Sequence, residues 1–255
     1  MTGAAGRIGT ALRAELRRGV AHLSCLDAQP IENLGKNEVG RQLDLGDLEG
    51  MTSAFDGMDG VIHLGGFPTE EDFHDIAQVN IVGTFHVFEA ARRAGVSRVV
   101  LASTNHVTGF YPVDVRVDPD MPARPDTFYG VSKAAGEAIG RLYADKFGLR
   151  VACLRIGTYE DRPLERRHMS TWASPDDTVA AFKAAMNSPD LDFSIFYVVS
   201  SNRDNYWDME AGKRVGFVPT DHAEDFKRDL GGAVYEFQGG PFTSVDYTES
   251  HLRPH

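Results

Sequence analysis

A glycine-rich turn that runs directly into a helical pattern opens the sequence, and no other feature limits the possible folds as strongly. Gly3, Gly6 and Gly9 recur at three-residue intervals, and residues 10–18 then place apolar side chains at helical spacing before Gly19. Such a turn lets the backbone approach a pyrophosphate, and the following helix offers free N–H groups and the positive end of its dipole. The residues predicted to bind a dinucleotide here are Gly3, Gly6, Arg7 and Ile8.

Strand-like and helix-like segments alternate after this turn. Strands are predicted at residues 21–26, 39–43, 59–64, 98–103, 149–156 and 193–199, and helices at 72–93, 129–147, 176–187 and 223–230. This alternation predicts an α/β fold of the Rossmann type, with a doubly wound parallel sheet. We expect one compact unit: a cofactor-binding core (1–157) and a mainly substrate-binding C-terminal lobe (158–255), from which about 176–199 returns to the core.

The strand expected before the glycine turn is reduced to Met1 and Thr2. In dinucleotide-binding units a buried apolar strand leads into this turn. One hypothesis is that the natural start lies upstream and that Met1 stands at a valine-type codon inside this strand. The alternative is a chain that lacks most of its first strand, and we expect such a protein to be poorly stable.

The composition narrows the classes of partner. The formal net charge of −11 argues against nucleic acid and anionic membranes, which require a basic surface. No run of 18 apolar residues and no signal-peptide layout is found, so we expect a cytoplasmic protein. Cys25 and Cys153 lie in apolar runs and are predicted to be buried free thiols, and no metal-ligand spacing is found. An anionic substrate would need a specific arginine to capture it against the overall field.

Asp27 directly follows the 21–26 strand, 18 positions beyond Gly9. Its carboxylate can accept hydrogen bonds from an adenosine ribose and would repel a 2′-phosphate, which favours NAD over NADP. The alternative is a turn aspartate before Pro30.

Asn80 is predicted to contact the cofactor and also to brace the loop after residues 59–64. The other predicted cofactor contacts are Asp44, Leu45, Leu64, Gly65, Gly66 and Ile156.

Tyr129 and Lys133 are four positions apart on a predicted helix, so their side chains share one face. An isolated tyrosine titrates near pH 10, and a nearby cation favours its phenolate. The pair is a candidate base for removing a hydroxyl proton near neutral pH, which requires about 4 kcal/mol of differential stabilisation. Lysine alone is not expected to supply this, and an oxidised nicotinamide would add a second positive charge. The alternative is an exposed helix pair without a catalytic role.

These motifs together resemble the extended short-chain dehydrogenase/reductase family. Thr104, 25 positions before Tyr129, matches the hydroxyl residue of that family. The sequence is similar in particular to uronate dehydrogenases, and the pair Asn105-His106 is the most specific part of this likeness. The other similar runs are residues 103–112, 122–126, 154–157, 169–172 and 237–240.

The resemblance implies NAD-dependent oxidation of the anomeric carbon of a hexuronic acid, galacturonate or glucuronate, to an aldarolactone. It implies that Tyr129 takes the C1 hydroxyl proton, that Thr104 orients that oxygen, and that Lys133 holds the cofactor ribose and favours the phenolate. It also implies a homo-oligomer, formed through the helices at 72–93 and 129–147. The implied substrate contacts are Thr104, Asn105, His106, Tyr129, Thr158 and Arg167.

Two of these contacts have structural alternatives. A guanidinium suits bidentate binding of a carboxylate, but Arg167 lies in a cluster with Arg162 and Arg166 whose members are often solvated. As the candidate for binding the substrate carboxylate, we prefer Arg167 to Arg166. His106 could instead brace the loop at Pro112.

The sequence also departs from the family and leaves other functions open. Pro68 stands where family members carry a small hydroxyl residue, and residues 202–208 keep Trp-Asp but differ around it. A nucleotide-sugar epimerase or dehydratase would use the same threonine, tyrosine and lysine, but generally needs a larger C-terminal lobe. A non-catalytic dinucleotide-binding protein is disfavoured by the intact Thr104, Tyr129 and Lys133 and favoured by the truncated first strand.

Overall fold

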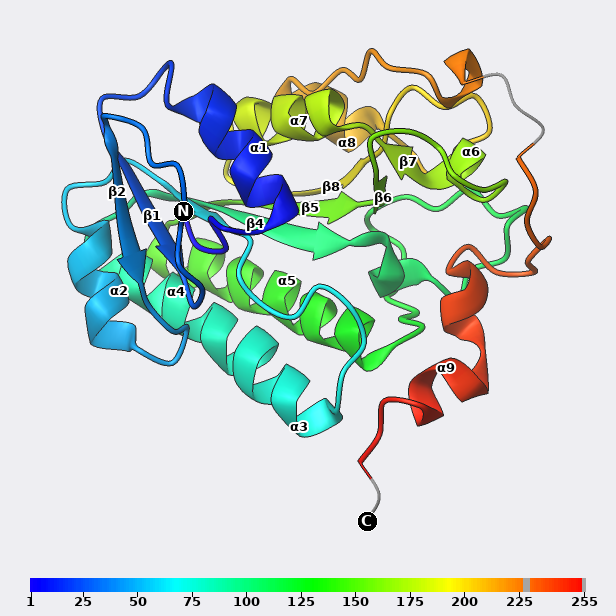
Figure 1. Ribbon diagram of the computed structural model, residues 1–255, viewed down its shortest axis with the longest axis horizontal. Coiled ribbons are helices and arrows are strands. Elements are labelled where there is room, and N and C mark those ends of the chain that lie inside the picture. The colour runs from blue at the N-terminus through cyan, green and yellow to red at the C-terminus, as the bar shows by residue number, and fades with distance from the viewer. Residues whose placement is uncertain (227–229, 254–255) are drawn as a thin grey trace.

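A parallel sheet between two layers of helices forms the centre of the computed structural model, which describes residues 1–226 and 230–253 (Figure 1). A four-stranded part has the order β3 (Val61–His63), β4 (Arg98–Thr104), β5 (Arg150–Ile156) and β8 (Phe193–Val198). A two-stranded part pairs β1 (Leu23–Asp27) with β2 (Glu38–Gln42). All these pairings are parallel, so the predicted doubly wound α/β fold is confirmed.

A single residue, Thr2, joins the two parts of the sheet. It forms parallel bridges to Leu26 in β1 and to His63 in β3, at the place of a first strand. Its N–H donates to the Ile62 carbonyl at 3.0 Å, and its carbonyl accepts from the Leu64 N–H at 3.2 Å. The order is therefore β2, β1, Thr2, β3, β4, β5, β8, and the glycine turn leaves the sheet at its topological switch point.

Helices cover both faces of this sheet (Figure 1). One face carries α1 (Arg7–Leu16), α7 (Pro175–Asn187) and α8 (Glu210–Val215). The other carries α2 (Leu48–Phe55), α4 (Gly83–Arg93) and α5 (Phe128–Phe147). The predicted helix 72–93 is divided into α3 (Phe73–Ile76), a π-helical turn (Ala77–Val82) and α4.

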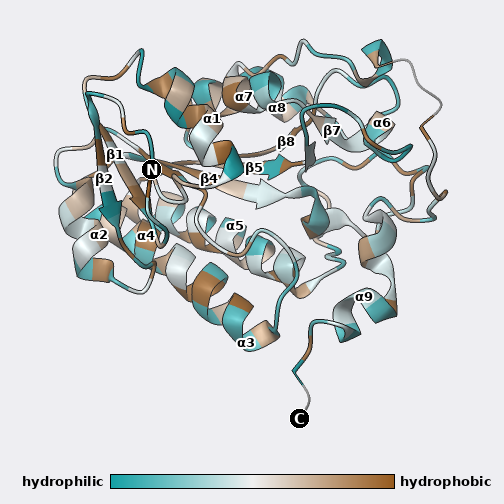
Figure 2. Ribbon diagram, viewed as in Figure 1, coloured by the Kyte–Doolittle hydropathy of each residue, from teal (hydrophilic) through white to brown (hydrophobic). Residues whose placement is uncertain are grey.

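The apolar core lies on both sides of the strands, and the central strands are hydrophobic along much of their length (Figure 2). All seven residues of β4 are buried. Because successive side chains point to opposite faces, Val100 joins the cluster with Phe182 under α7, whereas Leu101 joins the cluster with Phe88 under α4. Burying each such side chain contributes about 1.5–3 kcal/mol.

The predicted C-terminal lobe lies partly beyond the carboxyl ends of the strands (Figure 1). Its short elements are β6 (Thr158–Tyr159), α6 (His168–Thr171), β7 (Trp172–Ala173) and α9 (Val245–Glu249). Residues of α7 and β8 pack into the same core as Leu12 of α1. The division of the chain at residue 157 stays a prediction.

The predicted helix at 223–230 is not continuous: the structure has a 3-10 turn at Ala223–Asp225, and residues 227–229 lie outside the described residues. Cys25 and Cys153 are buried free thiols, as predicted. Among the described residues, no helix has the length and apolar character needed to cross a membrane.

Candidate active site

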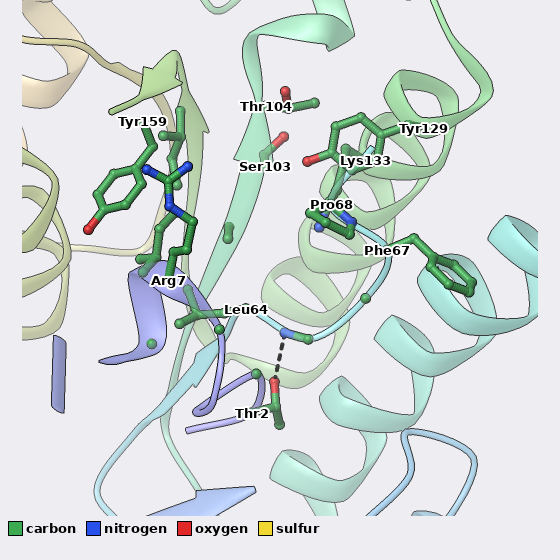
Figure 3. A pocket seen from close by; sticks show the side chains of 18 of the residues that line it. Thr2, Arg7, Leu64, Phe67, Pro68, Ser103, Thr104, Tyr129, Lys133 and Tyr159 are labelled. Carbon is green, nitrogen blue, oxygen red and sulfur yellow. Dashed lines mark hydrogen bonds between the residues drawn. The ribbon is translucent and has the colours of Figure 1, made fainter. Parts of the chain in front are cut away.

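A cavity of about 1100 Å³ opens beside the carboxyl ends of the strands (Figure 3). It is lined by every predicted site residue except Asn80. The chain therefore brings together the glycine turn, the end of β4, the start of α5 and residues of the C-terminal lobe. Among lining residues that the sequence did not single out are Gln29, Gln78, Tyr159, Glu160, Glu165, His168 and Phe242.

The glycine turn forms one wall of the cavity and leaves no room for side chains. Gly3 has φ +67°, and a Cβ there would lie 2.7 Å from the Gly65 nitrogen. A Cβ on Gly9 would lie 2.2 Å from the Gly3 carbonyl oxygen. Gly6 precedes α1, whose N-terminus has no side-chain cap and no acidic residue in its first turn. Free N–H groups at an uncapped helix start fit the pyrophosphate of a dinucleotide.

The Arg7 side chain is held by contacts with two residues that follow β5 in the chain. Its guanidinium makes two hydrogen bonds to Glu160, at 3.1 and 2.8 Å, and lies 5.3 Å from the centroid of the Tyr159 ring. Figure 3 shows Arg7 and Tyr159 next to each other. The pair therefore links the glycine turn to the C-terminal lobe. A cofactor contact by Arg7 stays a prediction.

The Asp27 carboxylate ties the end of β1 to the glycine turn. Oδ2 accepts from the Ala5 N–H and Oδ1 from the Gln29 N–H, both at 2.9 Å. A carboxylate has about four acceptor sites, so these bonds leave capacity for ribose hydroxyls. Asp27 therefore has the turn role that the sequence left as the alternative, and it also lines the cavity, so its contact with an adenosine ribose stays a prediction.

A buried polar chain supports the cofactor wall from behind, and the sequence did not predict it. His63 contacts Thr2 Oγ1 through Nδ1 at 2.7 Å and Thr84 Oγ1 through Nε2 at 3.0 Å. Thr2 Oγ1 accepts from the Gly65 N–H at 3.3 Å, the dashed line in Figure 3. Burial lowers the pKa of His63 to about 3, so this imidazole is neutral at physiological pH.

Asn80 lies behind the cavity rather than in its lining. Its Oδ1 accepts from the Phe67 N–H at 2.8 Å, and its Nδ2 donates to the Phe67 carbonyl at 3.2 Å and to Ser132 Oγ at 3.1 Å. The side chain therefore braces the loop after β3, and this placement does not support the direct cofactor contact that we predicted. Leu64, Gly65 and Gly66 of that loop do line the cavity.

Thr104 ends β4, and Tyr129 and Lys133 lie on the first turns of α5. In Figure 3 the Tyr129 hydroxyl points toward Ser103 and Thr104. Burial raises the pKa of Tyr129 to about 12, an effect that the Thr104 hydroxyl partly opposes, and burial lowers the pKa of Lys133 to about 8. The ammonium lies 5.7 Å from the phenol ring centroid. Lysine alone therefore leaves Tyr129 protonated at neutral pH.

The start of α5 is held by a carboxylate distant in the sequence. Glu70 is 1% exposed, and its two oxygens accept from the backbone N–H groups of Phe128 at 3.0 Å and Tyr129 at 2.8 Å. An acidic group at this position also complements the helix dipole. Glu70 thus fixes the backbone that carries the candidate base.

Arg167 is the buried member of the arginine cluster: it is 7% exposed, whereas Arg162 and Arg166 are exposed. Its Nε donates to the Gln238 carbonyl at 3.0 Å, and its guanidinium lies 5.9 Å from the Phe242 ring centroid. Among the described residues, Nη2 has no hydrogen-bond partner. A buried cation with an unused donor that lines the cavity is suited to bind an anionic group.

Two more predicted contacts, Asn105 and Thr158, line the same cavity. Asn105 Nδ2 is also buried without a partner among the described residues. Thr158 Oγ1 is 2.8 Å from Thr171 Oγ1. Together with Arg167, these groups place polar side chains in one lining.

Known proteins resemble this chain along most of its length. The model of the NAD dependent epimerase/dehydratase family matches residues 1–174. The chain is 40% identical to a uronate dehydrogenase of Agrobacterium fabrum, over 95% of each chain, and 36% identical to one of Pseudomonas syringae pv. tomato, over 96% of this chain and 92% of that protein.

Solved structures agree with these relatives. The crystal structure of uronate dehydrogenase from Agrobacterium tumefaciens is similar with a TM-score of 0.90 and 39% identity, covering 97% of this chain and 96% of that one. A tyrosine-to-alanine mutant of that enzyme complexed with NAD gives a TM-score of 0.89 at 39% identity, covering 95% of both chains. The chain belongs to the NAD-dependent epimerase/dehydratase family.

Proposed function

We propose that this protein is an NAD-dependent dehydrogenase that oxidises the anomeric carbon of a hexuronic acid, galacturonate or glucuronate, to an aldarolactone. The observation that carries the proposal is one cavity that contains both a glycine-lined wall and the buried Arg167, with Thr104, Tyr129 and Lys133 in the same lining. The similarity to uronate dehydrogenases supports the same reaction.

Each polar residue of the cavity has a separate role in the proposed reaction. The Arg167 guanidinium binds the substrate carboxylate, and the Thr104 hydroxyl orients the C1 oxygen. Tyr129 takes the proton of the C1 hydroxyl as the C1 hydrogen departs as hydride. When bound, NAD⁺ supplies the hydride acceptor and a positively charged nicotinamide ring. Lys133 binds the cofactor ribose and adds positive charge near the phenol.

The protein alone holds Tyr129 far from the phenolate form. Bringing its pKa from about 12 to neutrality requires roughly 7 kcal/mol. Lys133 does not provide this by itself, because the pKa of Tyr129 is about 12 although the lysine ammonium already lies 5.7 Å from its ring centroid. The proposed base is therefore active only in the complex with the oxidised cofactor, which limits proton abstraction to the competent state.

Appearance of NADH absorbance on mixing the purified protein with NAD and a sugar tests this function. We expect a signal with galacturonate or glucuronate and a far weaker one with galactose and glucose, which lack the carboxylate. Silence with all four, while NAD still binds, would refute the proposal. NAD that stays bound through purification and releases no NADH would favour the epimerase or dehydratase alternative.

We also propose a homo-oligomer formed through α4 and α5. Phe85 on α4 and Val131, Leu142 and Phe147 on α5 are between 39% and 49% exposed. Exposed apolar side chains on two adjacent helices are suited to an interface between copies. Light scattering would give more than one chain mass for the wild type and a monomer for Leu142→Glu. A monomeric wild type would contradict the proposal.

We further place the enzyme in the cytoplasm. The two free, buried cysteines support a reducing compartment. Fractionation of cells that express the native gene tests this: recovery from an extracytoplasmic fraction would overturn it.

A further inference from the structure

His106 is paired with a carboxylate on the side away from the cavity. Its Nδ1 lies 2.8 Å from Asp126 Oδ2 and 3.0 Å from Oδ1. The Asp126 side chain has no exposed surface, and His106 lines the cavity. Among the described residues, Nε2 of His106 has no hydrogen-bond partner. One ring nitrogen is therefore engaged by the protein, and Nε2 remains available for a further hydrogen bond.

Asp126 itself is held tightly. A Cβ added to either Gly109 or Gly239 would come within 1.9 Å of Asp126 Oδ2, so two backbones pack directly against the carboxylate. Thr127 donates from its hydroxyl to Asp126 Oδ1 at 3.2 Å and accepts from the Gly130 N–H at 2.9 Å, which caps α5. The carboxylate is thus fixed relative to both His106 and the helix of Tyr129.

An ionised carboxylate only accepts hydrogen bonds, so the nitrogen that faces it must carry the proton. In the neutral imidazole the other nitrogen is then an acceptor. We propose that Asp126 is a positioning residue that keeps the proton of His106 on Nδ1, so that Nε2 accepts a hydrogen bond from a hydroxyl of the sugar acid. This inference rests on the proposed function.

The side-chain amide of Asn105 is a hydrogen-bond donor that would complement an acceptor at His106 Nε2. Asn105 Nδ2 is a buried donor that lacks a partner among the described residues and lines the same cavity. A donor from Asn105 beside an acceptor from His106 satisfies both the oxygen and the hydrogen of adjacent hydroxyls. Two donors would leave a hydroxyl hydrogen without an acceptor, which is costly in a buried site.

Asp126→Asn tests the polarity without changing the size of the side chain. The asparagine amide can donate to Nδ1 and so transfer the proton to Nε2, which would then be a donor. We expect kcat/KM for galacturonate to fall about 10-fold or more through KM, because a hydroxyl loses its acceptor. Asp120→Asn, an exposed change in the same loop, is the matched control and should have no effect.

A double-mutant cycle separates this role from a purely structural one. Asp126→Asn should lose its effect on kcat/KM in a His106→Ala background, while NAD affinity and thermal unfolding identify damage to the fold. Equal losses in both backgrounds would overturn the inference. A wild type that forms no NADH with either uronate would instead refute the proposed function.

The tautomer has a direct readout that needs no substrate. NMR spectra of protein with ¹⁵N-labelled histidine, recorded near pH 8.5, distinguish Nδ1–H from Nε2–H imidazoles, and His106→Ala identifies the signal. We expect Nδ1–H in the wild type and Nε2–H in Asp126→Asn. An Nε2–H tautomer in the wild type would contradict the assignment.

Discussion

One part of the cavity lining contains the glycine turn and Gly65, where the glycines offer only backbone, whereas another part contains Asn105, His106 and Arg167, which carry polar side chains. We call these the cofactor half and the substrate half. In the substrate half, two buried donors lack partners among the described residues. A backbone wall binds one constant cofactor, while a wall of side chains can be changed residue by residue to suit another substrate.

Both halves depend on buried polar groups behind them. Behind the cofactor half, His63 links Thr2 to Thr84. Behind the end of β4, Glu137 accepts two hydrogen bonds from Arg155, at 2.9 and 2.8 Å, and one from Ser103 at 2.6 Å. Removing one partner of the Glu137–Arg155 pair leaves an uncompensated buried charge, so this support is expected to be sensitive to mutation.

The largest expected effect is a loss of turnover that leaves binding to both halves of the cavity intact. Tyr129→Phe should lower kcat by about 1000-fold or more, because the proton acceptor is lost, while NAD affinity changes little. Tyr143→Phe, on the same helix and bonded to Glu89, is the control. Steady-state kinetics and NAD titration give both values, and retained turnover would remove Tyr129 as the base.

Gly9→Ala should damage the cofactor half alone. The new Cβ would lie 2.2 Å from the Gly3 carbonyl oxygen, so the turn must move, and we expect NAD affinity to fall about 100-fold. In Gly19→Ala the nearest atom is 4.0 Å away, and binding should be unchanged. Calorimetric titration with NAD checks this. Equal affinity in both variants would show that the backbone wall does not determine cofactor binding.

His63 makes the support of the cofactor half sensitive to acid. Its pKa is about 3 in the folded protein, against about 6.5 when unfolded, so the unfolded chain binds more protons between these values. Stability should therefore fall as the pH drops below 6.5, by roughly 2 kcal/mol at pH 5. Urea unfolding at pH 8 and pH 5 measures this.

The variant His63→Asn isolates the contribution of this side chain, because an asparagine does not titrate. The difference between its two unfolding free energies should be smaller than in the wild type by the same amount. His22→Asn, an exposed histidine, should retain the full wild-type loss. An unchanged loss in His63→Asn would exclude His63 as the acid-sensitive group.

The smallest expected effect concerns the choice of cofactor. Asp27→Ala should lower the ratio of kcat/KM for NAD to that for NADP by about 10-fold, because a carboxylate repels the 2′-phosphate. The variant also loses acceptors for two backbone N–H groups, so its thermal unfolding must be compared with the wild type. An unchanged ratio would limit Asp27 to its turn role.

The glycines and Asp27 that the sequence singled out all line the cofactor half. They could be recognised because they lie close together in the chain and belong to a local strand, turn and helix. The substrate half depends on contacts between distant segments. Glu70 bonds to residues 58 and 59 positions away, and Arg167 rests on Gln238, 71 positions away. Spacing carries no signal for such pairs, and Arg167 was found only through resemblance to a family.

Some of the unpredicted features could have been inferred in part. Asp126 lies in a run that resembles the family, but its contact with His106 spans 20 positions and leaves no periodic pattern. Asn80 was expected to contact the cofactor as well as brace a loop, and only the brace is visible in its hydrogen bonds. A polar residue in an apolar helix indicates a buried role without saying toward which partner.

The most direct test of the account is the selectivity for a carboxylate. It compares kcat/KM for galacturonate with that for galactose in the wild type, Arg167→Met and the exposed control Arg166→Met. We expect the wild type and Arg166→Met to prefer galacturonate about 100-fold or more, since charge-assisted contacts contribute several kcal/mol, and Arg167→Met to show little preference. An Arg167→Met enzyme that keeps the full preference would contradict the assignment of Arg167 and the division of the cavity into two halves.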